Sequence, residues 1–146
     1  PMNQKRWSEI HRINYLLSEM EACYHHASLK LGISDSVSLV LYTIYDTGED
    51  CLLSDIYKKT GISKQTIHSA IRTLEASGML YLEQLTGRTK KVVLTEQGKD
   101  YIQKTAAKIY AAEVQALDAW TDEEVDTYLR LLEKYADCFR QQVELL

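Results

Sequence analysis

Residues 63–78 carry a set of side chains whose types and spacing match the chemistry of base recognition in DNA. Apolar residues recur at helical spacing and predict one buried helix face: Ile67, Ala70, Ile71 and Leu74. The opposite face holds an amide, an imidazole, hydroxyls and a guanidinium, which are groups that hydrogen-bond to base edges in the major groove. Those residues are Gln65, His68, Ser69, Arg72 and Thr73. An ordinary amphipathic helix with a solvated polar face is the alternative interpretation.

The element before this helix makes a DNA-binding motif. Residues 52–61 predict a short helix that begins at Ser54 and ends at Gly61, and Ser63 is the expected cap of the second helix. Two helices joined by a short glycine-containing turn form a helix-turn-helix. Ser63, Lys64 and Thr66 lie at the start of the second helix, where free backbone N–H groups and the helix dipole favour a phosphate.

A predicted β-hairpin follows the helix-turn-helix directly. Residues 79–85 and 91–94 are typical of strands, and the turn between them centres on Gly87. Arg88 and Lys90 give this hairpin a basic tip. A helix-turn-helix followed by such a hairpin is a winged helix, in which the second helix enters the major groove. We expect Arg88 to reach the DNA backbone or the adjacent minor groove.

The charge of the chain is unevenly distributed. Residues 54–95 contain seven basic and three acidic residues, a net charge of +4. The remaining residues contain ten basic and eighteen acidic residues, a net charge of −8, and the whole chain has −4. A basic middle in an acidic chain suggests that the middle meets a polyanion while the flanks serve another purpose.

Long amphipathic helices are predicted at both ends of the chain. An apolar heptad series from Ile10 to Leu31 predicts a helix over residues 5–30, and Ser34 is expected to begin a helix that ends at Gly48. Thr95 is expected to begin one helix reaching residue 116, and Thr121 to begin the last. Their apolar faces exceed what a small central domain covers, which predicts a homodimer; an intramolecular three-helix bundle is the alternative.

These elements define the expected fold class: mainly α with a small β-hairpin wing. A winged helix-turn-helix DNA-binding domain over residues 33–98 would be flanked by an N-terminal dimerisation helix, 1–32, and C-terminal dimerisation helices, 99–146. A chain of 146 residues is long enough for one domain with such extensions. Its composition, 45% hydrophobic and 26% charged, argues against intrinsic disorder.

Composition also bears on location and on catalysis. The most apolar stretch, residues 39–45, is far shorter than the ~20 residues of a membrane span, and no signal-peptide core is visible. Cys23, Cys51 and Cys138 are an odd number at wide spacing, which favours a reducing cytoplasm over a disulfide framework. No glycine-rich phosphate loop, metalloprotease motif or nucleophile elbow occurs, so we expect no enzyme activity and no cofactor.

Three strings of the sequence resemble the MarR family of bacterial transcriptional regulators. They are 62–67, Ile-Ser-Lys-Gln-Thr-Ile; 74–78, Leu-Glu-Ala-Ser-Gly; and 88–98, Arg-Thr-Lys-Lys-Val-Val-Leu-Thr-Glu-Gln-Gly. The family pattern in the wing is Asp-x-Arg, a few residues, then Leu-Thr-x-x-Gly. Arg88 and residues 94–98 match it, whereas Thr86 stands where the acid is expected.

The resemblance implies a homodimeric regulator, most often a repressor, that binds a pseudo-palindromic operator. Many such proteins release DNA when a small, often aromatic, molecule binds between the dimerisation helices and the winged domain. His11, Tyr42 and Tyr45 are the candidates here to line such an effector cleft, with packing in the core as the alternative.

The run from Cys23 to His26 leaves two further hypotheses open. Adjacent helical residues point about 100° apart, so a metal site would also need His11, Glu113 or a partner chain, and we predict no metal site. The hydroperoxide-sensing branch of the family suggests instead a redox switch at Cys23, although only His26 offers a nearby activating charge. A buried thiol is the simpler interpretation, with Cys51 and Cys138 in the core or an interface.

The sequence therefore predicts a sequence-specific regulator that binds double-stranded DNA. A redox- or metal-sensing regulator of the same fold is one alternative. A dimeric protein-binding module, with the winged helix as its docking surface, is another.

Overall fold

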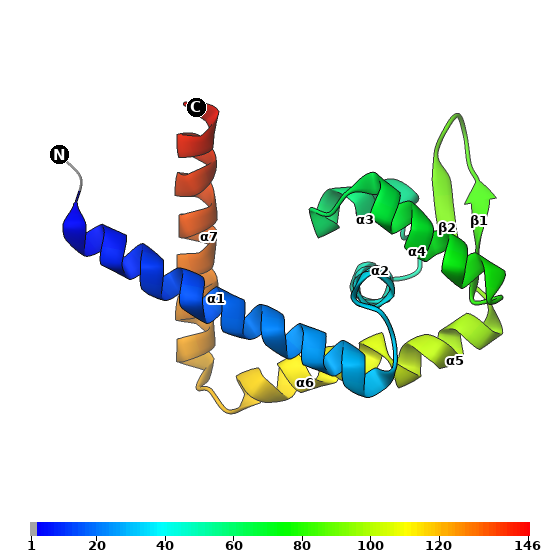
Figure 1. Cartoon of the computed structure of the whole chain (residues 1–146), viewed down its shortest axis with the longest axis horizontal. Coiled ribbons are helices and arrows are strands. Elements are labelled where there is room, and N and C mark those ends of the chain that lie inside the picture. Colours follow the sequence, from blue (N-terminus) through cyan, green and yellow to red (C-terminus); the bar gives the residue numbers. More distant parts are fainter. Residues whose placement is uncertain (1–2) are drawn as a thin grey trace. The chain divides into compact units, whose positions relative to one another are not determined.

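The computed structural model describes residues 3–146, so the first two residues of the predicted N-terminal segment lie outside the described part. The chain divides into two compact units, one ending at Tyr110 and the other formed by Ala111–Leu146. The elements shown in Figure 1 are α1 (Gln4–Leu31), α2 (Asp35–Thr47), α3 (Leu53–Thr60), α4 (Lys64–Ala76), β1 (Leu80–Gln84), β2 (Lys90–Leu94), α5 (Glu96–Lys104), α6 (Ala106–Asp118) and α7 (Asp122–Glu144). The predicted class, mainly α with a small β-hairpin, is confirmed.

The core of the first unit forms where α2 packs against α3 and α4. Its side chains come from α2, α3, α4, both strands, α5, the first residue of α6 and the loop before α3. The largest fully buried ones are Leu41, Ile56, Ile67, Ile71, Val40 and Cys51. All four predicted apolar positions of α4 are buried, which confirms its orientation. Burial of a side chain the size of Ile contributes roughly 1.5–3 kcal/mol, so this face fixes α4 and leaves its polar face outward.

Most helix starts follow the predicted capping residues, but α3 does not. Ser34, Ser63, Thr95 and Thr121 each accept a hydrogen bond from a first-turn backbone N–H. Ser54 lies inside α3, and the cap position is Leu52, whose N–H donates to the Asp55 carboxylate at 3.0 Å. Leu52 is extended and also forms a β-bridge with Lys91 of the wing, so the helix begins at the residue that follows this bridge.

The wing is an antiparallel hairpin in which Leu80 pairs with Leu94 and Gln84 with Lys90. The contacts made by the residues after β2 explain why the motif Leu-Thr-x-x-Gly has threonine and glycine at these positions. The Thr95 hydroxyl accepts from the Gly98 N–H at 3.0 Å and donates to the Gly78 carbonyl at 2.6 Å. A Cβ at Gly98 would lie 1.8 Å from the Met79 carbonyl oxygen, so only glycine lets α5 start this close to β1.

The single helix expected after Thr95 is in fact two helices, α5 and α6. The break is at Thr105, where φ is −125° and ψ is −93°. Thr105 is buried, and its hydroxyl donates to the Tyr101 carbonyl at 2.8 Å. Ile102, before the break, and Ala106, after it, are both buried. The apolar residues therefore keep helical spacing across the break, and the sequence pattern does not indicate it.

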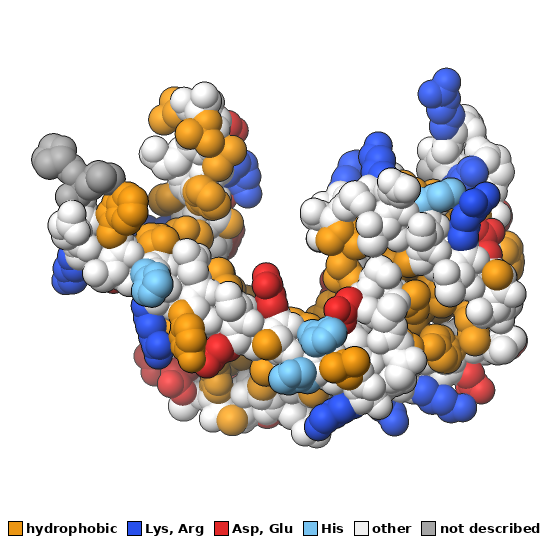
Figure 2. Space-filling view, in the orientation of Figure 1, with side chains coloured by type: hydrophobic (Ala, Val, Ile, Leu, Met, Phe, Trp, Pro, Cys, Tyr) orange, Lys and Arg blue, Asp and Glu red, His pale blue; other side chains and the backbone are white. Residues whose placement is uncertain are grey.

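The helices at the two ends of the chain leave their apolar side chains exposed. On α1, Ser28 is the only buried residue, and the uncovered series includes Ile10, Ile13, Leu17, Met20 and Tyr24. On α7 no residue is buried, and the uncovered series includes Leu129, Leu132, Tyr135, Phe139 and Val143. Figure 2 shows hydrophobic side chains on the surface of both helices. Across residues 3–146, no helix combines the length and apolarity that a membrane span needs.

Candidate nucleic-acid interface

The polar face of α4 is exposed, as the sequence predicted. Gln65, His68, Ser69, Arg72 and Thr73 all lie at the surface. The Thr73 hydroxyl donates to the Ser69 carbonyl at 3.0 Å, so toward an outside ligand its oxygen is chiefly an acceptor. The remaining side chains offer donors and acceptors of the kinds that distinguish base pairs in the major groove.

The first turn of α4 has the form of a phosphate-binding helix start. The Ser63 Oγ accepts from the Thr66 N–H at 3.2 Å and lies 2.8 Å from the Thr66 hydroxyl. The Lys64 ammonium lies 5.7 Å from the centre of the Tyr57 ring on α3, a cation–π contact that keeps this charge beside the helix start. These residues place N–H groups, hydroxyls and a cation at one exposed point.

The basic residues of the region divide into those with partners and those without. Lys59 donates to the Thr47 hydroxyl at 2.9 Å, and Lys91 forms a salt bridge with Asp50 at 3.3 Å. Within residues 3–146, no hydrogen bond or ion pair engages the side chains of Arg72, Arg88 or Lys90. Figure 2 shows Lys and Arg side chains over the helix-turn-helix and at the end of the hairpin. These guanidinium and ammonium groups are therefore available to an anion.

The wing tip is a turn over residues 85–89 between the paired Gln84 and Lys90. Gly87 has φ of +69°, which glycine adopts readily, and Arg88 follows it. The Gln84 side-chain amide donates to the Gly87 carbonyl at 2.6 Å and to the Thr89 carbonyl at 3.4 Å. Gln84 was not among the predicted site residues; its place opposite Lys90 becomes clear only from the strand register.

The three candidate effector residues do not line one cavity. Tyr42 lines a pocket of about 400 Å³ together with Tyr24 and His25 of α1. The Nδ1 atom of His25 lies 2.7 Å from Asp35 Oδ2. Tyr45 lines a different pocket, of about 720 Å³, between α2, β2 and α5. His11 is exposed on α1 and lines neither of these two pockets.

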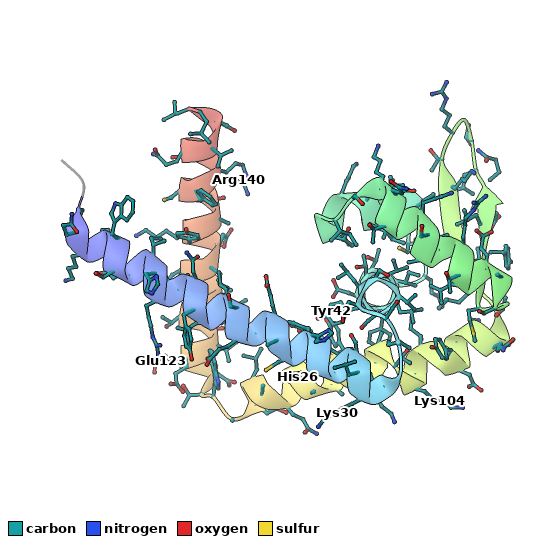
Figure 3. The ribbon with its side chains drawn as sticks, viewed as in Figure 1. His26, Lys30, Tyr42, Lys104, Glu123 and Arg140 are labelled. Carbon is teal, nitrogen blue, oxygen red and sulfur yellow. The ribbon has the colours of Figure 1, made fainter. Side chains whose placement is uncertain are left out.

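The tyrosines of α2 also pack against other aromatic rings, in line with the alternative prediction that they serve packing. The Tyr42 ring lies 6.4 Å from Tyr24 and 5.7 Å from Tyr110, and the Tyr45 ring lies 5.4 Å from Tyr110. Figure 3 shows the side chains, with Tyr42 labelled beside α2. The Tyr42 ring is thus both packed against aromatic residues and part of a pocket wall.

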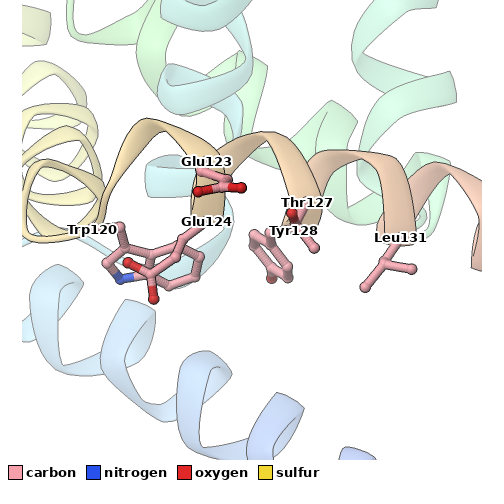
Figure 4. Close-up of a pocket in the computed structure, with 6 residues that line it drawn as sticks. All are labelled: Trp120, Glu123, Glu124, Thr127, Tyr128 and Leu131. Atoms are coloured by element: carbon pink, nitrogen blue, oxygen red, sulfur yellow. The ribbon is translucent and has the colours of Figure 1, made fainter.

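The second unit has a pocket of its own, on one face of α7. It measures about 500 Å³ and is lined by Trp120, Glu123, Glu124, Thr127, Tyr128 and Leu131 (Figure 4). The Trp120 and Tyr128 rings lie 5.3 Å apart. Trp120, Tyr128 and Leu131 give this pocket exposed apolar surface, and Glu123 and Glu124 add carboxylates.

The cysteines differ in burial. Cys51 is buried in the core, as expected, and burial raises the pKa of its thiol, with the nearby Asp55 carboxylate adding to the rise. Cys138 is exposed. Cys23 is exposed too, contrary to the simpler interpretation of a buried thiol; within α1 only Ser28 is buried. Among the described residues, no cluster of three His, Cys, Asp or Glu could hold a metal ion.

The comparison with known families decides what kind of domain carries this surface. Residues 31–88 match the MarR family. This segment is a MarR family domain. The resemblance seen in the sequence is thereby confirmed over α2, α3, α4 and the first strand of the wing. Proteins of the MarR family are transcription regulators and not enzymes, in agreement with the prediction that the chain is not an enzyme.

Solved structures of the MarR family share the fold over nearly the whole chain. A MarR family regulator from Neisseria meningitidis superposes with a TM-score of 0.80 at 18% identity, covering 98% of each chain. A MarR family protein from Bacillus stearothermophilus has a TM-score of 0.69 at 17% identity, covering 96% of this chain and 99% of the other. The MepR–DNA complex of S. aureus has a TM-score of 0.66 at 18% identity, covering 88% and 96%. A search of curated protein sequences found no match.

Proposed function

We propose that this protein is a sequence-specific regulator that binds double-stranded DNA as a homodimer and acts as a repressor. The observation that carries the proposal is the exposed polar face of α4 beside a basic wing in the same unit, with Arg72, Arg88 and Lys90 free of partners among residues 3–146. The MepR–DNA complex, which has a similar fold, supports DNA as the ligand. Because bacterial DNA lies in the cytoplasm, the proposal also predicts a cytoplasmic location.

The roles of the interface residues follow from their positions. The side chains on the outer face of α4 would read base edges: Gln65, His68, Ser69, Arg72 and Thr73. Ser63, Lys64 and Thr66 would hold a phosphate at the helix start, and Arg88 and Lys90 of the wing would hold the flanking backbone.

The dimer is proposed from the uncovered apolar faces of α1 and α7. Leaving so many large apolar side chains in water is costly, and a second copy of the chain would cover them. A two-fold dimer presents two α4 helices to half-sites about 34 Å apart, so a pseudo-palindromic operator follows.

An effector is proposed for the pocket lined by Tyr42. Its volume of about 400 Å³ suits a small molecule, and the Tyr24 and Tyr42 rings suit an aromatic one. Any part played by His11 in such a site would require the partner chain, since His11 lines neither pocket of the single chain that holds Tyr42 or Tyr45.

Selection of bound sequences from a random duplex library tests the proposal. We expect enrichment of an inverted repeat whose half-sites are spaced by one helical turn. Binding of random duplex should also weaken steeply with salt, because each neutralised phosphate adds about 0.9 to the log–log slope. A protein-docking module would enrich no sequence and would bind duplex poorly at every salt concentration.

A further inference from the structure

We propose that Gln84 is a positioning residue that holds the wing tip so that Arg88 presents its guanidinium to a DNA phosphate. The inference rests on the proposed DNA-binding function and adds a residue to it. Gln84 is the last residue of β1 and pairs with Lys90, the first residue of β2. Its side chain therefore stands at the base of the turn that carries Arg88.

The hydrogen bonds of Gln84 fix the backbone on both sides of Arg88. The side-chain Nε2 donates to the Gly87 carbonyl at 2.6 Å and to the Thr89 carbonyl at 3.4 Å, and these residues immediately precede and follow Arg88. A carbonyl oxygen only accepts, so the NH₂ end of the amide must face both partners and the orientation of the amide is determined. The Leu85 N–H donates to the same Thr89 carbonyl at 2.8 Å, which closes the turn.

Nothing else in the described residues aims the Arg88 side chain. No hydrogen bond or ion pair within residues 3–146 involves it. Thr86 offers no carboxylate at the position where the family pattern has an acid. The direction of Arg88 is therefore set by its backbone. Gln84 holds the Gly87–Arg88 peptide group directly before Arg88 and the Thr89–Lys90 peptide group one residue after it.

A held turn matters because an exposed loop that must order on binding loses affinity. Without the Gln84 clamp, by which we mean the two hydrogen bonds of its amide, Gly87 would leave the turn free to change conformation, because glycine populates many backbone conformations. The amide of Gln84 restricts this freedom before DNA arrives.

The test is a double-mutant cycle between Gln84→Met and Arg88→Ala, measured as affinity for random duplex. Methionine keeps the length of glutamine and removes the donor. We expect Gln84→Met to weaken binding about three- to tenfold, the worth of one or two exposed hydrogen bonds, and to lower the salt slope toward that of Arg88→Ala. In the Arg88→Ala background, Gln84→Met should have no further effect. Gln103→Met, a change of the same kind at an exposed position on α5, is the matched control and should bind as the wild type does.

The outcomes separate this inference from the proposed function. If Gln84→Met weakens binding equally with and without Arg88, glutamine touches DNA itself and the positioning role is refuted. If Gln84→Met binds like the wild type while Arg88→Ala does not, the clamp is not needed and the inference again fails, although DNA binding stands.

A readout without DNA tests the clamp even if the wild type binds no duplex. Backbone amide order parameters at residues 87–89 should fall in Gln84→Met and in Gln84→Ala, while the melting temperature stays unchanged. Unchanged order parameters would overturn the inference, whatever the outcome of the binding measurements.

Discussion

Replacing Arg72 by alanine should remove sequence discrimination without harming the fold. Arg72 lies on the exposed face of α4, one turn after His68, and no hydrogen bond or ion pair within the described residues engages its side chain. The folded chain therefore loses no interaction that holds it together. We expect the free energy of unfolding to change by less than about 0.5 kcal/mol, as for other free surface positions.

The effect on binding follows from the geometry of the guanidinium. A bidentate contact with guanine O6 and N7 contributes about 1–3 kcal/mol of discrimination. A dimer presents two copies of α4, so loss at both half-sites costs about 2–6 kcal/mol, which is roughly thirtyfold to more than ten-thousandfold in affinity. Random duplex lacks the matched guanine, and there the loss should be far smaller.

The assay is competition between the selected operator and variants changed symmetrically at each position of the half-site. Arg72→Ala should flatten the preference at one position and leave the others. Arg72→Lys is the control that keeps the charge but loses the planar fork, and it should also flatten that position. Equal weakening of every duplex by Arg72→Ala would refute base recognition and identify a phosphate contact.

Four further outcomes are expected. Arg88→Ala should lower affinity for operator and random duplex alike and reduce the salt slope by about 2 per dimer; no change in either would show that the wing does not touch DNA. Leu132→Asp should dissociate or unfold the dimer, measured by light scattering, and a folded, DNA-binding monomer would contradict the proposed assembly. Gly98→Ala should cost about 1–3 kcal/mol or more of stability, because its Cβ would lie 1.8 Å from a backbone oxygen; an unchanged melting temperature would refute this. Cys51 should resist alkylation in the native protein and react once it is denatured, as its burial and raised pKa imply; mass spectrometry of the labelled peptides would detect early labelling, the contrary result.

The features that sequence predicted best are those decided by a few neighbouring residues. The caps at Ser34, Ser63, Thr95 and Thr121 depend on a hydroxyl two or three residues from a free N–H. The buried face of α4 depends on a period of 3.6 residues. In these places local chemistry and the fold agree.

The failures lie where a distant part of the chain decides the local structure. The start of α3 coincides with the bridge from Leu52 to Lys91, about forty residues away, which the capping tendency of Ser54 does not reveal. The break at Thr105 carries neither glycine nor proline, and the buried positions on both sides keep a helical spacing. The separation of Tyr42 and Tyr45 into different pockets depends on how α1, β2 and α5 surround α2, which periodicity does not encode.

The uneven charge distribution affects the salt dependence of DNA binding in two opposing ways. Residues 54–95 carry a net charge of +4, whereas the rest of the chain carries −8. The basic residues attract a DNA duplex, and the acidic residues repel it. Salt screens the repulsion as well as the attraction, so the measured slope underestimates the number of phosphate contacts. The repulsive contribution is common to the wild type and to variants that leave the acidic residues intact. The difference in slope between the wild type and Arg88→Ala or Gln84→Met therefore isolates the wing contact, whereas the absolute slope does not.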